Sequence, residues 1–315
     1  MLSYFARRVG LALIQLLGLA LVAFSLIHLV PGNPVKELLG THATPHSVSV
    51  VSHRLGLDRP LPVQFVSFVS GVVTGHMGNS ITFGQSISSL ITERFVPSFV
   101  MILYGVVVAV LIGVPLAVLS AVRHGGPLDH GSRVFATISF AMPTFWLGLV
   151  LALIFGLKLH WLPVAGYTPS PGGIIRSLTL PAVVLGLSLL VIVVRTLRST
   201  ARATLSTEFV EAERARGLST SRIVLRHVMR NALMPTVTVL AVNVGFLIGG
   251  TVVLEQVFQI PGLGSLLFLS VEHRDYPVIE TVALMAGAAV VVMSLLADLA
   301  QAMMDPRVRL GARAV

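Results

Sequence analysis

Residues Glu208 to Pro235 read EFVEAERARGLSTSRIVLRHVMRNALMP, and this charged stretch separates two long apolar segments. Glutamates and arginines three positions apart support a first helix. Gly217 can take the left-handed conformation that ends this helix, and Ser219 can cap the next one. A basic stripe then follows the second helix at Arg222, Arg226 and Arg230. We therefore expect two short helices that contact another protein, the alternative being an ordinary positively charged loop beside a membrane.

The composition of the 315-residue chain is that of an integral membrane protein. Hydrophobic residues make up 55% and charged residues 11%, and the mean hydropathy of +0.90 excludes a soluble globular domain. The sequence pI of about 11.1 reflects arginines in loops that orient a membrane chain, so nucleic acid is not expected as a partner. Because the chain has no cysteine, a disulfide framework, a thiolate metal site and a thiol nucleophile are excluded.

Six apolar segments are long enough to cross a hydrocarbon layer about 30 Å thick, which takes roughly 20 helical residues. They are Val9–Val30, Phe95–Val122, Val134–Leu157, Ser177–Val194, Pro235–Leu254 and Thr281–Met304. The first follows Arg7 and Arg8 and has no small-residue cleavage site, so we expect an anchor that is retained. Leu61–Val73 is too short and too amphipathic to be a seventh span.

The arginines predict the orientation of these spans. Most of the 22 basic residues fall on one side if both termini and the loop 205–234 are cytoplasmic, as the positive-inside rule favours. The segment 31–94 is then a long external loop, in which Pro60 and Pro62 indicate the start of a helix. We expect a single all-α membrane domain over residues 1–315, with six transmembrane helices.

The charged stretch resembles the Glu-Ala-Ala loop of bacterial ABC-importer permeases, because Glu211, Ala212 and Gly217 match that motif. Glu213 departs from it, since the motif has a small residue at that position. Other blocks resemble the dipeptide, oligopeptide and nickel branch of these permeases, in its first-subunit, dipeptide permease B-like type. These blocks are Arg7–Pro34, Leu55–Phe65, Trp161–Tyr167, Glu255–Glu280 and Asp305–Leu310, and in this order they extend over nearly the whole chain.

The resemblance implies the fold of a type I ABC importer permease, with a short cytoplasmic coupling helix that docks into an ATPase. The residues that it places on this coupling element are Glu208, Glu211, Ala212, Arg214, Ala215, Gly217 and Leu218. It also implies a multi-pass protein of the bacterial inner membrane, surrounded by lipid. The implied partners are a second homologous permease, two ATP-binding subunits and an external substrate-binding protein.

The chain is then expected to be a transport subunit with no cofactor and no catalytic site. It has no Gly-x-x-x-x-Gly-Lys-Ser/Thr phosphate loop, so ATP hydrolysis has to come from the partner ATPases. The implied substrate is a dipeptide or oligopeptide, and nickel is the alternative within the branch. An ion-coupled secondary transporter would place carboxylates or histidines in the middle of the spans, and a membrane enzyme would need a cluster of catalytic residues. Neither pattern is present.

Three histidines in the external segment raise the question of a metal site. His42, His46 and His53 lie close together in the sequence, but Pro45 interrupts any helix that would align the first two. No acidic residue lies within this group, and we expect no metal there.

Acidic residues at the ends of the spans are expected to be paired or hydrated. Asp298, near the end of the last span, is expected to pair with a nearby arginine or to face cytoplasmic water. Glu255 and Glu280 flank the last external loop and are expected to be solvated. Within that loop, Pro261 and Gly262 predict a turn.

Overall fold

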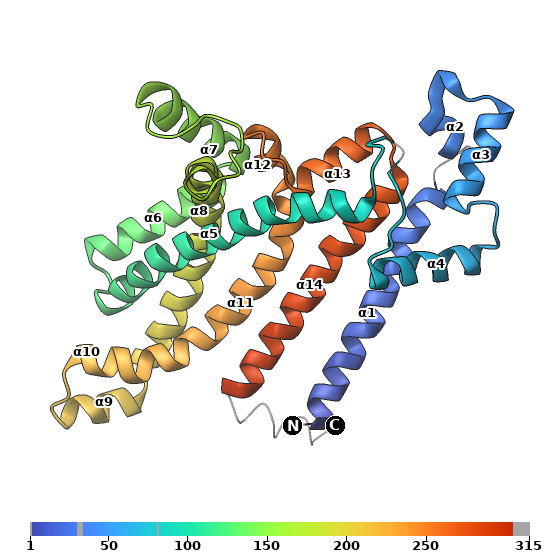
Figure 1. Ribbon diagram of the computed structural model, residues 1–315. Coiled ribbons are helices and arrows are strands. Elements are labelled where there is room, and N and C mark those ends of the chain that lie inside the picture. The colour runs from blue at the N-terminus through green and yellow to red at the C-terminus, as the bar shows by residue number, and fades with distance from the viewer. Residues whose placement is uncertain (1, 30–33, 81, 305–315) are drawn as a thin grey trace.

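The chain forms an all-helical bundle in a computed structural model that describes residues 2–29, 34–80 and 82–304 (Figure 1). The α-helices are α1 (Leu2–Leu29), α2 (Pro34–Leu39), α3 (Pro45–Leu55), α4 (Leu61–Thr74), α5 (Ile87–Val122), α6 (Pro127–Ala141), α7 (Thr144–Leu151), α8 (Pro171–Leu205), α9 (Glu208–Ala215), α10 (Thr220–Ile223), α11 (Met229–Gly250), α12 (Val252–Val257), α13 (Leu263–Glu272) and α14 (Tyr276–Met304). A 3₁₀ helix, η1 (Gly40–His42), and two π-helical segments, η2 (Ala152–Lys158) and η3 (Val224–Val228), complete the described elements.

Five helices are long and apolar enough to cross a membrane. They lie in α1, in α5, in α8, in the continuous helix Thr220–Gly250 and in α14. A sixth candidate is a broken one, because α6 and the helix α7–η2 together pass the same test but meet at an angle of 102°. By length and composition, the described residues therefore contain five candidate spans, or six if the bent pair counts as one span, and this agrees with the predicted all-α membrane fold.

A proline causes the break in the third predicted span, Val134–Leu157. Met142, which precedes Pro143, has φ −82° and ψ 128°, because the proline ring disfavours helical geometry in the residue before it. Pro143 is the N-cap residue of α7, where its missing N–H leaves no helical hydrogen bond unmade. One transmembrane helix was expected over this segment, and two helices with a sharp bend are present instead.

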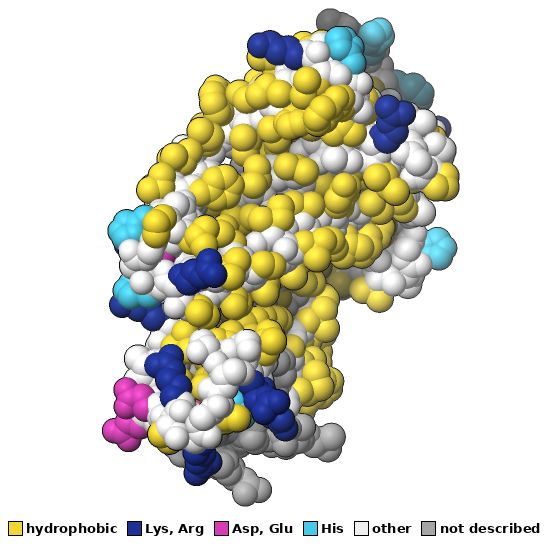
Figure 2. Space-filling view, turned by 90° about the vertical axis from the view of Figure 1, so that its left-hand side faces the viewer, with side chains coloured by type: hydrophobic (Ala, Val, Ile, Leu, Met, Phe, Trp, Pro, Cys, Tyr) yellow, Lys and Arg dark blue, Asp and Glu magenta, His cyan; other side chains and the backbone are white. Residues whose placement is uncertain are grey.

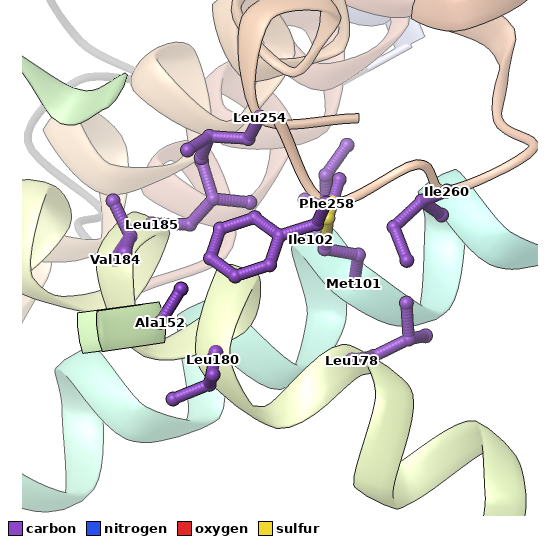
Figure 3. Close-up of a cluster of buried hydrophobic side chains, with 10 residues drawn as sticks. All are labelled: Met101, Ile102, Ala152, Leu178, Leu180, Val184, Leu185, Leu254, Phe258 and Ile260. Atoms are coloured by element: carbon purple, nitrogen blue, oxygen red, sulfur yellow. The ribbon is translucent and has the colours of Figure 1, made fainter. Parts of the chain in front are cut away.

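The core lies between α5 and α8. Glycines bring the two helices together: a Cβ at Gly105 would lie 2.9 Å from Leu185 Cβ, and one at Gly186 would lie 2.8 Å from Val108 Cγ1. Figure 3 shows the adjoining cluster, in which the ring of Phe258 packs among side chains from α5, α8 and α12. In the most apolar stretch of α8, 72% of residues are buried, against 17–28% in the other four spans. α8 is therefore the central helix of this chain.

The bundle has two distinct ends (Figure 1). We call the end with α2, α3 and α13 the outer end, and the end with α9 and α10 the inner end, following the orientation that the arginines predict. The first turn of α1 and the last turn of α14 also lie toward the inner end. On the face drawn in Figure 2, hydrophobic side chains form a broad band, with Lys and Arg mainly toward its two ends.

The described part of the predicted external segment contains the short helices α2, α3 and α4, and α5 already begins within it, at Ile87. α4 has 14 residues and begins between Pro60 and Pro62, close to the predicted start. α3 begins at Pro45, with Thr44 as its cap, so His42 and His46 lie in different helices as predicted.

Candidate functional site

The charged stretch folds into a helical hairpin at the inner end, formed by α9, α10 and η3 and called here the charged hairpin. The turn depends on Gly217, which has φ +80°. Its N–H donates to the carbonyl of Arg214 at 2.9 Å, and the N–H of Leu218 donates to the carbonyl of Glu213 at 3.3 Å. A Cβ at Gly217 would meet no atom within 4 Å, so only the backbone conformation requires glycine here. The predicted helix break is confirmed.

Two details of the hairpin differ from the prediction. The second helix is not short, because it continues from Thr220 through η3 and α11 to Gly250 and includes Pro235 in its interior. The charged part and the apolar residues that follow it thus form one continuous helix that runs into the membrane span. Ser219 occupies the cap position but its side chain makes no capping hydrogen bond, and its hydroxyl lies 3.3 Å from that of Ser221 instead.

An apolar cluster holds the charged hairpin against the bundle. The hairpin has two arms, α9 and the helix of α10 and η3. Val210 of the first arm and Ile223 of the second are fully buried. They pack with Val228 of η3 and with side chains at the inner ends of α5, α8 and α11, namely Ala117, Ala121, Leu197, Ala201 and Ala232. Burying a side chain such as valine or isoleucine stabilises by about 1.5–3 kcal/mol. The hairpin is therefore attached to the ends of three spans, and displacement of either part displaces the other.

The predicted coupling residues all lie in the charged hairpin, and most of them are exposed to solvent. Leu218 is half-buried and packs against the apolar cluster. The other six are exposed: Glu208, Glu211, Ala212, Arg214, Ala215 and Gly217. The three arginines of the basic stripe are exposed as well.

Two apolar side chains on the hairpin escaped the sequence analysis. Phe209 is 52% exposed and Leu225 is 72% exposed, although both lie beyond the apolar spans among charged neighbours. Exposed apolar side chains with charges around them are typical of protein contact surfaces. The sequence did hold a signal, because both are apolar residues within the charged stretch. Phe209 directly follows Glu208, and Leu225 directly precedes Arg226.

Glu213, the departure from the Glu-Ala-Ala motif, is buried between the two arms. Its Oε1 lies 3.2 Å from His227 Nε2, and the ring of Phe209 meets His227 edge-on at 5.5 Å. Glu213 Oε2 has no hydrogen-bond partner among the described residues. The charge in place of a small residue is thus matched by a histidine on the facing helix, a pairing that the sequence analysis missed.

A second polar cluster links the α5–α6 turn to α8 just above the hairpin. Asp129 is fully buried, and its Oδ1 accepts from Arg198 Nε and from Ser120 Oγ, each at 2.6 Å. Its Oδ2 accepts from the N–H of Gly125 at 3.1 Å. Arg198 directly follows Leu197, which belongs to the apolar cluster of the hairpin. The same turn of α8 thus holds both the α5–α6 connection and the charged hairpin.

The outer end contains a buried carboxylate, and here the sequence expectation was wrong. Glu255, expected to be solvated, is 0% exposed. Its Oε1 accepts from Ser98 Oγ at 2.6 Å, and its Oε2 accepts from the N–H of Ser265 at 2.7 Å. Ser98 Oγ in turn accepts from the N–H of Leu263 at 2.8 Å. Burial raises the pKa of Glu255, while these hydrogen bonds act in the opposite direction.

This arrangement explains the turn at Pro261 and Gly262, which was predicted. The carboxylate lies at the N-terminus of α13, where backbone N–H groups favour a negative charge. Any Cβ at Gly262 would overlap the carboxyl group of Glu255. Glu280 was also expected to be solvated but is buried, at 7% exposed, in the second turn of α14.

Asp298 pairs with Arg8 of α1, as predicted, and so joins the first and last spans near the inner end. In the external segment, His53 Nδ1 lies 2.7 Å from Asp58 Oδ2. Within the described ranges, no group of three or more metal-ligating side chains is placed to hold an ion.

Comparison with known proteins identifies the family of the chain. The family described as binding-protein-dependent transport system inner membrane component matches residues 113–310, and the family of the corresponding N-terminal component matches residues 1–111. The chain belongs to this permease family.

Relatives of the permease match it over nearly their full length. A putative peptide permease protein of Brucella suis is 36% identical over 98% of this chain and 99% of its own. The di/tripeptide transport system permease protein DppB of Pseudomonas aeruginosa is 33% identical with the same coverage of 98% and 99%. The glutathione transport system permease protein GsiC of Pectobacterium atrosepticum is 36% identical, again over 98% and 99%. The permease is thus a multi-pass inner-membrane transport subunit of the ABC importer class and not an enzyme.

Proposed function

We propose that this permease is one of two homologous membrane subunits of an ATP-driven importer for short peptides. Together the two permeases form the translocation pathway, two cytoplasmic ATPases supply the energy, and an external binding protein delivers the peptide. The names of the relatives support a peptide substrate, since they refer to peptides, di- and tripeptides and glutathione. These names do not favour nickel.

The observation that carries the proposal is the charged hairpin. Its exposed face holds Phe209, Leu225 and the charged residues around them, while its buried face packs on the ends of three spans. A docked ATPase would therefore move those spans directly, because packed helices transmit a displacement that a flexible linker would absorb. We assign ATPase contact to Glu208, Glu211, Ala212, Arg214, Ala215 and Gly217. Leu218 packs against the apolar cluster and so holds this surface in place.

Reconstitution tests the proposal. The permease is placed in vesicles with its partner permease, the ATPases and the binding protein, and uptake of labelled di- and tripeptides is measured. Uptake should require both ATP and the binding protein, and the purified permease alone should not bind ATP. Peptide uptake driven by an ion gradient without ATP would instead support a secondary transporter, and competition by nickel would support the nickel alternative.

A further inference from the structure

A cavity of about 920 Å³ lies at the outer end, between the N-terminal segment and the start of α14. Its wall is formed by α1, α3, α4, the loop before α5 and the second turn of α14. Small-molecule sites in proteins are concavities of about 300–1,000 Å³ with a few convergent polar groups. The volume suits a ligand the size of a short peptide.

Hydrogen bonds between the segments fix the wall of this outer cavity. Oε1 of Gln64, in α4, lies 3.2 Å from Nε2 of His28, in α1. Nε2 of Gln64 donates to the carbonyl of Arg59 at 2.7 Å. On the other side, Ser80 donates to the carboxylate of Asp275, at the turn that precedes α14. The cavity is therefore bounded by segments that are connected to one another.

Glu280 is the only acidic residue among the described residues that line the outer cavity. It is more than nine-tenths buried, and its Oε1 has no hydrogen-bond partner among the described residues. A buried carboxylate oxygen without a partner is costly, and such groups ask for an explanation in a native structure. A cationic hydrogen-bond donor would supply the missing partner.

Aromatic rings also line the outer cavity. Phe24 lines it, with the His28 ring at 4.4 Å and the Phe68 ring at 6.3 Å between centroids. Aromatic faces attract ammonium groups. Arg54 and Arg59 line another part of the wall and can attract a carboxylate.

We propose that the outer cavity binds the free amino terminus of a short peptide, with Glu280 as the partner of the ammonium group. The aromatic wall then contacts the adjoining part of the peptide, and the two arginines lie on the side of its carboxylate. This proposal rests on the proposed function, because it takes the ligand to be the transported peptide. The permease would thus recognise the amino terminus of the peptide directly, in addition to any recognition by the binding protein.

The absence of cysteine from the chain makes a direct test possible. Ser67 of α4 is exposed and lines the outer cavity, so Ser67→Cys introduces a single thiol there. The assembled complex, without binding protein, is treated with a thiol-specific reagent, and labelling of this chain is measured by mass spectrometry. A dipeptide such as Ala-Phe is added as the probe and compared with its N-acetylated form.

The free dipeptide should slow labelling of Ser67→Cys, and the acetylated dipeptide should not. Adding Glu280→Gln should raise the dipeptide concentration needed for half-protection by about tenfold or more, as expected for loss of one charge-assisted hydrogen bond. The matched control is Glu272→Gln, because Glu272 is exposed at the end of α13 and does not line the cavity. Equal protection by both peptides, or protection unchanged by Glu280→Gln, would overturn the proposal.

Two further measurements distinguish failure of this proposal from failure of the proposed function. If binding protein without peptide protects the thiol, the cavity receives a group of the binding protein and the peptide site is wrong. If wild-type vesicles import peptides with ATP but protection is absent, the importer function stands and only the cavity assignment fails. If Glu280→Gln does not assemble, the comparison of free and acetylated dipeptide on Ser67→Cys alone still decides the proposal.

Discussion

The outer turn, which we define as residues 255–265, where α12 leads into α13, and the charged hairpin each contain a buried glutamate, but the two carboxylates are held very differently. Glu255 has both oxygens hydrogen-bonded and lies at the N-terminus of α13. Glu213 has one oxygen near His227 and the other without a partner among the described residues. A fully satisfied buried network rigidifies its surroundings, whereas a partly satisfied one is a weaker constraint.

This difference in hydrogen bonding corresponds to a difference in the expected rigidity of the two regions. The outer turn joins α5, α12 and α13 through groups that can adopt few other arrangements. The charged hairpin is held mainly by apolar contacts, which are non-directional and tolerate small shifts. We infer that the outer turn acts as a fixed point, while the hairpin can adjust to a partner that changes conformation. The following predictions test this comparison.

The largest effect is expected from Gly262→Ala at the outer turn. The added methyl group would overlap the carboxyl of Glu255 and break hydrogen bonds to it, which we expect to lower the free energy of unfolding by about 3 kcal/mol. Gly249→Ala is the matched control, because a Cβ there meets no atom within 4 Å. Thermal unfolding in detergent measures both variants. Equal midpoints would mean that the outer turn is not a fixed point.

Gly217→Val at the charged hairpin should have a smaller effect on stability and a large one on transport. A side chain in the left-handed conformation costs about 1–2 kcal/mol, which we expect the helical bundle to tolerate. We expect near-normal expression, but ATP hydrolysis that no longer drives peptide uptake. Gly217→Asn is the control, since asparagine accepts this conformation more readily. Normal uptake by Gly217→Val in reconstituted vesicles would place the coupling element elsewhere.

The Glu213–His227 pair can be measured with a double-mutant cycle. Glu213→Gln and His227→Gln should each destabilise the protein, and the double variant should lose less than their sum, with an interaction energy of about 1 kcal/mol. Chemical or thermal unfolding gives the three differences. Strict additivity would show that the two side chains do not stabilise each other, and that the arms are joined by apolar contacts alone.

The smallest effect on stability is expected for Leu225→Ala. Its side chain is largely exposed, so the free energy of unfolding should change by less than about 0.5 kcal/mol. Binding of the ATPases should nevertheless weaken, because an exposed leucine in a docking surface is buried in the complex. Co-purification of ATPases with the permease measures this. Val253→Ala, at an exposed apolar position at the other end of the bundle, should leave ATPase binding unchanged.

Local features of the sequence predicted much of this structure. Gly217 ends α9 because a left-handed turn depends on the residue at that position and its neighbours. The long apolar runs correspond to helices because their length and composition are sufficient to define a membrane span.

Burial, in contrast, depends on residues that are distant in the sequence. Glu255 was expected to be solvated because it flanks a loop, yet its partner Ser98 lies 157 positions away. The Asp129–Arg198 pair and the Glu213–His227 pair likewise involve helices whose relative placement a single sequence does not specify. The bend at Pro143 had a local cause, and a closer reading of that proline within the third predicted span would have found it.

The hydrogen bond between Ser98 and Glu255 also has a consequence for biogenesis. At about 5–20 residues per second of synthesis, Ser98 leaves the ribosome roughly 8–30 s before the glutamate that it will contact. During that interval the serine hydroxyl can bond to a carbonyl of its own helix, so the second span can enter the membrane without its final partner. The outer turn then closes only after α12 and the first turn of α13 have been made. Formation of this contact would mark the step at which an inserted chain becomes a folded permease.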